Sequence, residues 1–425
     1  MRDLPINADR LAASLDELGT IGRDHRDGSI NRICVTPVER QAHDMMATWM
    51  TAVGLRVTRD AFGNTIGTRP GRGAGGSIAI GSHLDSVPRG GNYDGAAGVV
   101  GALEVVRALD DADVRTEHDL TLVCFSAEEG ARFGKPCLGS KAAVEGLGDD
   151  ELALSDRDGV SLRDALAAVG MRPLETTRPA PWTRDVAAFL ELHIEQGRVL
   201  QEAGEDVGVV DCIAGNRRLR MRLRGQTDHS GATPMRLRRD ALVAAAEVVV
   251  AVHRLVRRAE DLVGTVGELT VHPGAMTAVP GRVDLGVDVR GTDARVQERT
   301  IQQVIEAARA ACRDHDVELE VDDVSDVPPV ELSPWLRDVV AGAARRVTGR
   351  ARVLTSGAGH DAGVTARRIP TSVIFIPCRD GVSHSPAEWA APEHLATGTQ
   401  VLAQAVLDVD AQATTAAAVR SREQS

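Results

Sequence analysis

SIAIGSHLDSVPRGGNYDG, residues 77–95, is the stretch that decides the fold. It opens with an apolar run at 77–80, which predicts a buried strand, and passes directly to His83 and, among glycines, to Asp94. A helical pattern follows over 96–109. A strand followed by a helix is typical of the α/β class, in which active sites lie beyond the carboxyl ends of the strands. The stretch therefore predicts an α/β domain with reactive side chains at a strand end.

Three further segments repeat this arrangement of an apolar strand followed by polar residues. The apolar runs 120–125, 186–192 and 371–376 predict strands. The polar clusters that accompany them are SAEEG (126–130), ELHIEQG (191–197) and SHSPAEW (383–389). Four strand ends that present histidine, aspartate and glutamate would converge on one place in such a sheet.

The residue types in these clusters indicate a metal centre. Imidazole and carboxylate ligands together suit Zn²⁺, Mn²⁺, Co²⁺ or Ni²⁺, and ligands drawn from several loops are typical of a catalytic site. Asp85 follows His83 by two residues, so on an extended segment both side chains point the same way and Asp85 can orient the imidazole. In the adjacent pair Glu128 and Glu129, one carboxylate can bind metal while the other accepts a proton, which suits metal-assisted hydrolysis.

Each cluster alone has a simpler explanation. A single histidine after a strand is more often a hydrogen-bonded structural residue, and a Glu-Glu pair is usually a solvated face. Four clusters at corresponding positions, with glycines beside them, favour the metal site. By contrast His253, His272 and His315 have no such partners, and we expect them to be structural.

The middle of the chain has a different pattern. Residues 213–328 read as strand, helix, two strands, helix and strand, the order of a ferredoxin-like unit. We expect this unit to be inserted into a domain formed by 1–212 and 329–410, with 411–425 as a disordered tail. Within the insert, His229 and Arg290 follow or end strands and could bind an oxyanion and a substrate carboxylate.

Composition excludes several classes of partner. The formal net charge of −12 argues against nucleic acid and anionic membranes, and an aromatic content of 2% argues against base stacking. The apolar stretch 241–252 contains Glu247 and is too short to cross a membrane. Six scattered cysteines and a first thirty residues without a secretory signal predict a cytoplasmic protein.

With these motifs in place, the chain resembles the hydantoinase/carbamoylase family, part of the metallopeptidase superfamily that includes aminoacylases and carboxypeptidase G. The resemblance runs from about residue 30 to 407. The segments that carry it are GSHLDSVPRGGNYDG (81–95), FSAEEGARFG (125–134), LELHIEQG (190–197), DHSGATPM (228–235), SGAGHDA (356–362) and SHSPAEW (383–389). It implies a di-metal peptidase-like catalytic domain, with a central mixed sheet flanked by helices, and an inserted ferredoxin-like lid and dimerisation domain.

The resemblance also implies a ligand set for two divalent ions per subunit. One ion would be held by His83, Asp94 and His193, and the other by Asp94, Glu129 and His384, so that Asp94 bridges the two. Glu128 matches the general base, which would take a proton from the metal-bridging water.

Further positions match the family's substrate contacts. These are Gln196, His229 and Arg290, with Gly359 and His360 on a loop that borders the substrate. In the family, the residue matched by His229 reaches into the partner subunit's site and stabilises the oxyanion. The resemblance thus implies a homodimer that is required for activity.

Residues at two places in the sequence leave the identity of the substrate undecided. Relatives commonly have an asparagine where this chain has Thr277, which keeps a hydroxyl but lacks the amide's reach and its second hydrogen-bonding group. Asn216 and Arg217 stand where allantoate-hydrolysing members often have Gln-Arg. We therefore expect Thr277, Asn216 and Arg217 to border the substrate.

The expected reaction is hydrolysis of the ureido C–N bond of an N-carbamoyl-L-amino acid or a similar small acid, with release of ammonia and carbon dioxide. The first alternative is allantoate hydrolysis, and the second is aminoacylase or peptidase activity. A third alternative, a binding protein without activity on the same scaffold, is disfavoured because silent relatives tend to lose a ligand or the base, and all six residues are present here.

Overall fold

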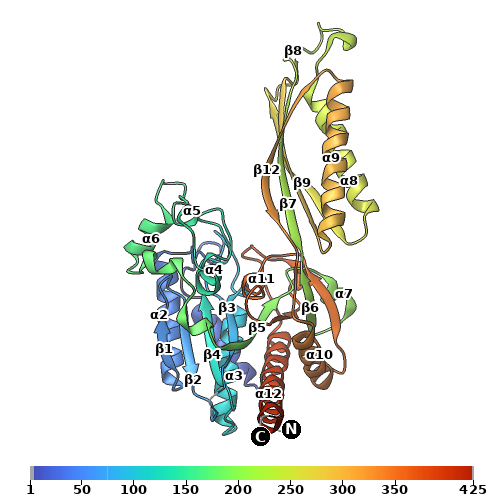
Figure 1. Cartoon of the computed structure of the whole chain (residues 1–425). Coiled ribbons are helices and arrows are strands. Elements are labelled where there is room, and N and C mark those ends of the chain that lie inside the picture. The colour runs from blue at the N-terminus through green and yellow to red at the C-terminus, as the bar shows by residue number, and fades with distance from the viewer. Residues whose placement is uncertain (1–3, 74, 424–425) are drawn as a thin grey trace. The chain divides into compact units, whose positions relative to one another are not determined.

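The structure is a computed structural model that describes residues 4–73 and 75–423 (Figure 1). The chain divides into two compact units. The larger consists of Met1–Asp211 with Glu331–Ser425, and the smaller of Cys212–Val330. Each unit has its own core, and each is described separately below.

The larger unit is built on a nine-stranded sheet, and this sheet is mixed, as the family resemblance implies. Its strands lie in the order β1-β2-β4-β3-β5-β15-β6-β13, and β14 pairs with β6. Strands β4, β3, β5 and β15 lie side by side and run parallel. At the two sides of this group, β2 runs antiparallel to β4, and β6 runs antiparallel to β15. The strands are β1 (Arg56–Arg59), β2 (Thr65–Arg69), β3 (Ser77–His83), β4 (Asp119–Phe125), β5 (Val186–Ile194), β6 (Gly208–Ile213), β13 (Val330–Glu331), β14 (Arg352–Ser356) and β15 (Thr371–Ile376).

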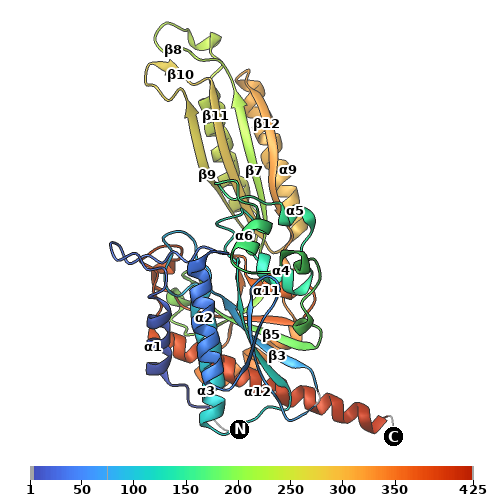
Figure 2. The same cartoon turned by 90° about the vertical axis from the view of Figure 1, so that its left-hand side faces the viewer.

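Helices cover this sheet (Figure 2). Helix α3 (Ala96–Asp111) packs on β3 and β5, while α12 (Pro392–Glu423) packs on α3, α10 and β15. The apolar side chains of these helices and of the sheet form one main core, with members from α1 through α12. The other helices of this unit are α1 (Ala8–Leu18), α2 (Pro37–Ala52), α4 (Leu138–Val144), α5 (Asp149–Leu152), α6 (Leu162–Ala168), α7 (Val199–Ala203), α10 (Pro334–Thr348), α11 (Asp361–Thr365), and the 3₁₀ turns η1 (Pro173–Thr177), η2 (Pro181–Thr183) and η4 (Arg379–Gly381).

Helix α3 approaches the sheet closely because Gly98 has no side chain. A Cβ atom on Gly98 would lie 2.0 Å from the carbonyl oxygen of Leu192 and 2.9 Å from the Cβ of Ser82. Both neighbours immediately precede a predicted metal ligand. The glycine therefore sets the distance between α3 and the strand ends that carry the site.

The smaller unit is a four-stranded antiparallel sheet with two helices packed on it. The order of the strands is β12-β7-β11-β9, and the β-α-β-β-α-β succession agrees with the predicted ferredoxin-like insert. Alternate residues of β7 and β11 are buried against α8 and α9. The elements are β7 (Gly215–Arg224), α8 (Ala241–Arg258), β9 (Leu262–His272), β11 (Arg282–Gly291), α9 (Ala294–Asp314) and β12 (Glu318–Val327), with β8 (Asp228–His229), the 3₁₀ turn η3 (Met235–Leu237) and β10 (Ala278–Val279) at one end.

The structure differs from the sequence prediction at two places. Helix α12 continues to Glu423, into residues for which the sequence predicts a tail without regular structure. The extension is rich in alanine, the best helix former, so helical propensity outweighs the absence of an apolar stripe. The short helices α4, α5 and α6 were not predicted, because none is long enough to show a helical period. None of the described helices is long and apolar enough to span a membrane.

Candidate metal centre

The five predicted ligands all come from the larger unit, at the carboxyl ends of its parallel strands. His83 is the last residue of β3 and His193 lies near the end of β5. Glu129 follows β4, His384 lies in the loop after β15, and Asp94 lies just before α3. The topology rule that predicts their convergence therefore holds for this sheet.

Asp94 stands at the centre of this arrangement and faces two groups of side chains. Its Oδ1 atom lies 3.3 Å from His83 Nε2 and 3.0 Å from His193 Nε2. Its Oδ2 atom lies 3.4 Å from His384 Nε2, which is itself 3.2 Å from Glu129 Oε2. The two groups, His83–Asp94–His193 and Asp94–Glu129–His384, each offer ligand atoms within 4.8 Å of one another.

The residues fit a pair of divalent ions. Glu129 Oε1 is buried and accepts no hydrogen bond from the described residues, although a buried polar atom normally has a partner. A third group, Glu191, His193 and His360, has a similar spacing. Its atoms are already used, since His360 Nε2 bonds Ser356 Oγ at 2.8 Å and Glu191 accepts hydrogen bonds from Ser82 Oγ and the Ala362 N–H. The two groups that share Asp94 are therefore the candidate metal ligands.

The electrostatics of the cluster favour positive charge. Hydrogen bonds to Asp94 and Glu129 raise the pKa of His384 to about 10. Burial alone would raise the pKa of Asp94, but the charge of His193 and hydrogen bonds from the three histidines hold it well below its usual range. The negative charge of Asp94 and Glu129, which favours the protonated histidines, would also attract a divalent cation.

Asp85 links the two sides of the site. Its Oδ1 accepts the N–H of Glu128 at 2.9 Å and its Oδ2 accepts the N–H of Glu129 at 3.1 Å. His83 Nδ1 is 3.1 Å from the carbonyl oxygen of Asp85 and 3.5 Å from its carboxylate. Asp85 thus orients the imidazole mainly through its backbone, and its carboxylate fixes the Glu128–Glu129 loop.

Glu128 has the surroundings of a proton acceptor beside the ligands. Its Oε2 lies 3.9 Å from His83 Nε2, and its Oε1 lies 3.4 Å from Cys137 Sγ. Burial raises the pKa of Glu128 well above its usual value, with His83 opposing the shift. The carboxylate is close to the His83 group without being one of the grouped ligands.

Sequence reasoning missed two residues that hold Asp94. Glu388 Oε1 accepts the N–H groups of Tyr93 at 2.8 Å and Asp94 at 3.0 Å, and Ser383 Oγ lies 2.8 Å from both Glu388 Oε2 and Asp94 Oδ2. Both belong to the SHSPAEW segment, so their proximity to His384 was the available signal. Gln196, predicted as a substrate contact, donates from Nε2 to Asp94 Oδ2 at 2.7 Å.

The backbone of the site is strained at three points. Ala127, Gln196 and His384 have φ values of 59°, 57° and 56°, a region that residues with a Cβ rarely adopt. Each lies beside or within a predicted functional position. Such strain persists only where the surrounding contacts hold the residue in place.

The loop after β14 carries Gly359 and His360. A Cβ on Gly359 would meet no atom within 4 Å, so the loop is open at that residue. The buried His360 ring lies edge-on to that of His193, with 4.5 Å between the ring centroids. The loop therefore borders the ligand cluster through His360.

The remaining predicted contacts belong to the smaller unit. His229 is exposed, and its Nδ1 accepts the N–H groups of Gly231 at 3.1 Å and Ala232 at 3.2 Å, which leaves Nε2 as a donor. Thr277 is exposed in the loop before β10. Arg290 pairs with Asp288 at 2.9 Å.

Asn216 and Arg217 are already engaged within the smaller unit. Asn216 Oδ1 accepts a hydrogen bond from Ser325 Oγ at 2.7 Å. Arg217 pairs with Asp323 at 3.0 Å and also with Glu298. Asn216 is the cross-strand partner of Arg290 in the β7–β11 ladder, so these two lie together.

The chain is similar to known proteins over most of its length. The sequence profile of peptidase family M20/M25/M40 matches residues 79–408. An N-carbamoyl-L-amino acid amidohydrolase from Geobacillus stearothermophilus is 38% identical over 93% of this chain and 97% of its own length. A ureidoglycolate hydrolase from Oryza sativa subsp. japonica is 36% identical over 94% of this chain and 84% of its own length.

A solved structure extends the likeness to the fold. The crystal structure of an amidase of the hydantoinase/carbamoylase family from Burkholderia multivorans superposes with a TM-score of 0.90 at 34% identity, covering 96% of this chain and 98% of the other. The likeness therefore includes both units.

Proposed function

Because this chain belongs to peptidase family M20/M25/M40 and, within it, to the hydantoinase/carbamoylase amidases, which are metal-dependent hydrolases of C–N bonds, we propose that it cleaves a ureido C–N bond. The substrate is an N-carbamoyl-L-amino acid or a similar small ureido acid, and the products include ammonia and carbon dioxide. The observation that carries the proposal is the pair of ligand groups that share Asp94, with the Glu128 carboxylate beside them and in neither group.

Two divalent ions, of zinc, manganese, cobalt or nickel, are proposed to occupy the groups that share Asp94. When bound, such ions polarise a carbonyl group and lower the pKa of water. The first would be held by His83, Asp94 and His193, and the second by Asp94, Glu129 and His384. The histidines and carboxylates must release their protons when an ion binds, so ion binding is expected to weaken at low pH.

Glu128 is the proposed general base. Its carboxylate accepts a proton from the attacking water and can return that proton to the leaving nitrogen. Asp85 fixes the backbone of Glu128 and Glu129 through its two oxygens, so the base and the ligand beside it keep one geometry. Burial, which raises the pKa of Glu128, favours the protonated form that the second transfer needs.

Substrate binding is proposed to use residues of both units. In the larger unit these are Gln196, Gly359 and His360. In the smaller unit Arg290, whose Nε and Nη2 bond Asp288, is proposed to bind the substrate carboxylate. His229 offers its Nε2–H to the developing oxyanion, and Thr277, Asn216 and Arg217 border the substrate. His229 is proposed to act in the partner subunit's site of a homodimer.

The experiment that tests the proposal is ammonia release from chelator-stripped protein, with and without Mn²⁺, Zn²⁺, Co²⁺ or Ni²⁺. The substrates are N-carbamoyl-L- and D-amino acids, β-ureidopropionate, allantoate, ureidoglycolate and several dipeptides. Release that depends on metal and is largest for an N-carbamoyl-L-amino acid is the expected result. Metal-dependent turnover of dipeptides alone would overturn the proposal.

Allantoate and ureidoglycolate hydrolysis are the alternatives within the family. The hydrolase from Oryza sativa acts, by its name, on ureidoglycolate, and its similarity to this chain is close to that of the carbamoyl-amino acid hydrolase. Thr277, which offers one hydroxyl where relatives commonly have an amide, is the position at which these substrates are expected to be distinguished.

A further inference from the structure

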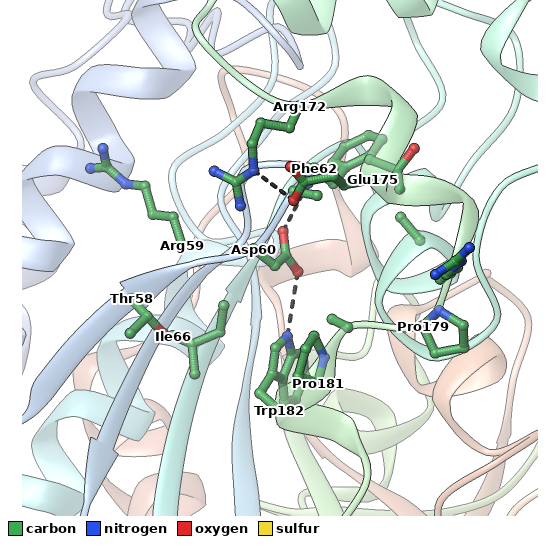
Figure 3. A pocket seen from close by; sticks show the side chains of 15 residues that line it. Thr58, Arg59, Asp60, Phe62, Ile66, Arg172, Glu175, Pro179, Pro181 and Trp182 are labelled. Atoms are coloured by element: carbon green, nitrogen blue, oxygen red, sulfur yellow. Dashed lines mark hydrogen bonds and ion pairs between the residues drawn. The ribbon is translucent and has the colours of Figure 1, made fainter.

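A cavity lies in the larger unit, and none of the residues that line it belongs to the ligand groups. It has a volume of about 330 Å³ and is formed by the β1–β2 turn, α4, and the segment that contains η1 and η2. Figure 3 shows Arg172 and Trp182 on opposite sides of Asp60 in this cavity. Its volume is at the lower end of the range for small-molecule sites, roughly 300–1,000 Å³.

The only carboxylate deep in the cavity is already satisfied by the protein. Asp60 Oδ1 accepts the backbone N–H groups of Phe62, Gly63 and Asn64, and its Oδ2 accepts Asn64 Nδ2 at 2.7 Å and Trp182 Nε1 at 3.4 Å. Burial nevertheless raises the pKa of Asp60. With five donors around it, this carboxylate has little left to offer a cationic ligand.

Positive donors, by contrast, remain available at the rim. Arg172 uses Nε to bind Glu175 at 2.8 Å, and its terminal nitrogens have no hydrogen bond to a described residue. Arg178 is exposed and forms no ion pair with the described part of the chain. Arg59, the third arginine of the lining, pairs with Asp44 outside the cavity lining. The lining thus carries three arginines against two carboxylates, Asp60 and Glu175, within a chain of net charge −12.

The rest of the lining is apolar and partly flat. Trp182, Pro179 and Pro181 supply the accessible apolar surface, whereas Phe62 and Ile66 line the cavity from the core and are only 2% and 1% exposed. Such a surface takes a planar apolar body, and an arginine fork beside it takes a carboxylate. The chemistry of the lining therefore describes one ligand class, a small aromatic or flat aliphatic carboxylate.

Two sets of contacts join this cavity to the loop that carries Glu128 and Glu129. The Asn64 side chain, which donates to Asp60, also accepts the Ser126 N–H at 3.0 Å through Oδ1 and donates to the Gly139 carbonyl at 3.0 Å. The Trp182 ring lies 6.3 Å, centroid to centroid, from that of Phe125. Phe125 and Ser126 are the residues that lead into Ala127 and Glu128.

We propose that this cavity is an effector site for small flat carboxylates, and that its occupancy is transmitted through Trp182, Asp60 and Asn64 to the Glu128–Glu129 loop. A ligand that lies against Trp182 contacts the residue that donates to Asp60 and packs near Phe125. Because Glu129 belongs to a ligand group, occupancy of the cavity changes the affinity of that group for metal, and metal changes the affinity of the cavity by the same factor.

Binding is tested with benzoate as the probe, by calorimetry on the metal-loaded protein. Benzamide, which has the same shape without the charge, and benzylamine, which carries a positive charge, are the matched ligands. Benzoate is expected to bind saturably and the other two weakly. Arg178→Ala is expected to weaken benzoate binding by about tenfold, the loss of one charge-assisted hydrogen bond. Arg163→Ala, at a half-buried arginine that lies outside the lining and pairs with Asp149, should leave it unchanged.

These variants also separate the cavity from the catalytic site, which could itself bind a carboxylate. Quenching of tryptophan fluorescence by benzoate should largely disappear in Trp182→Phe. Equal binding of benzoate and benzamide, or benzoate binding that Arg178→Ala and Trp182→Phe leave unchanged, would overturn the proposed site.

Transmission is tested by titrating Zn²⁺ into chelator-stripped protein with and without saturating benzoate. The apparent Zn²⁺ affinity is expected to change by a factor of about 5 or more, within the usual range of coupling between sites. Trp182→Phe, which removes the Nε1 donor to Asp60, should reduce this factor. An identical affinity in both titrations would refute the transmission. Neither experiment requires turnover, so both remain decisive whatever the substrate is.

Discussion

Asp94 has more contacts of functional consequence than any other residue of the site. Its carboxylate faces both ligand groups, while Ser383 and Gln196 donate to Oδ2 and Glu388 holds its backbone N–H. The resemblance to the hydantoinase/carbamoylase family predicted Asp94 as a ligand, at a position that follows a strand and a histidine. It could not predict the contact with Glu388, which is 294 residues away and depends on the packing of two loops.

At this scale the first prediction concerns Glu128. Glu128→Gln keeps the size of the side chain but removes its ability to accept a proton, so we expect turnover to fall by about 10²- to 10⁴-fold. Metal content, measured by elemental analysis, should stay the same because Glu128 belongs to neither ligand group. Near-normal turnover in the variant would show that another residue is the base.

The second prediction concerns Asp85. In Asp85→Asn, one of the two oxygens that accept the Glu128 and Glu129 N–H groups becomes an NH₂ group, which cannot accept. We expect metal affinity or activity to fall by about 10- to 100-fold, as is usual when a partner of the ligands is lost. Metal titration by calorimetry measures the effect, and unchanged affinity together with unchanged turnover would contradict it.

At the scale of elements, the sequence was most informative where packing and pattern agree. The run 120–125 is buried on both faces and was recognised as the strand β4. The alternation of 218–224 indicated β7, whose second face is not in the core. Helices α4 to α6 lay beyond this reasoning, since their four to seven residues are held by a local cluster of apolar contacts and not by a repeating pattern.

Two helical glycines allow a matched test of packing. Gly98→Ala places a Cβ against the backbone of β5, and we expect the free energy of unfolding to fall by about 1–3 kcal/mol. In Gly342→Ala, in α10, the new Cβ meets only the flexible end of the Arg346 side chain, at 3.5 Å. This variant should raise the free energy of unfolding by about 0.5–1 kcal/mol. Urea unfolding measures both. If both variants changed the free energy of unfolding in the same direction, the close approach of α3 to β5 would not require a glycine at position 98.

Helix α5 provides a prediction of pH dependence. Burial would raise the pKa of Glu151, but Lys135, Lys141 and the Gly148 N–H lower it to about 2. The unfolded chain should have a value of about 4.3. The resulting stabilisation is therefore present above about pH 4.3 and is lost as the pH falls towards 2.

Urea unfolding of wild type and Glu151→Gln at several pH values checks this. Wild type should have the higher midpoint at neutral pH, and the difference should shrink as the pH falls below about 4.3. A difference that stays constant with pH would mean that the ion pairs contribute nothing.

At the scale of the whole molecule, residues proposed to bind one substrate belong to two separate compact units. The sequence predicted an insert at 213–328 because its pattern differs from that of 1–212. In the structure, the contacts divide the chain after Asp211 and after Val330. The sequence cannot reveal whether the substrate contacts of the smaller unit serve their own chain or a partner, because both arrangements need the same residues.

Mixing two variants distinguishes these arrangements. Glu128→Gln and His229→Ala should each be nearly inactive alone. If His229 serves the partner, a mixed dimer contains one site with an intact base and an intact histidine, so mixing the two proteins should restore part of the activity. Light scattering establishes the oligomeric state. Exchange of subunits without recovery of activity would place His229 in its own chain's site.

The left-handed backbone at Ala127, Gln196 and His384 has a consequence for protein engineering. Glycine is the residue that adopts these angles without a steric penalty, so a search for thermostabilising substitutions would select these three positions among the first. A glycine at Ala127 would also widen the range of angles open to the chain beside Glu128. A glycine at Gln196 or His384 would also remove a donor to Asp94 or a proposed metal ligand. Variants chosen for heat resistance at these positions should therefore lose rate as they gain melting temperature, and heat resistance is better sought in helices far from the strand ends.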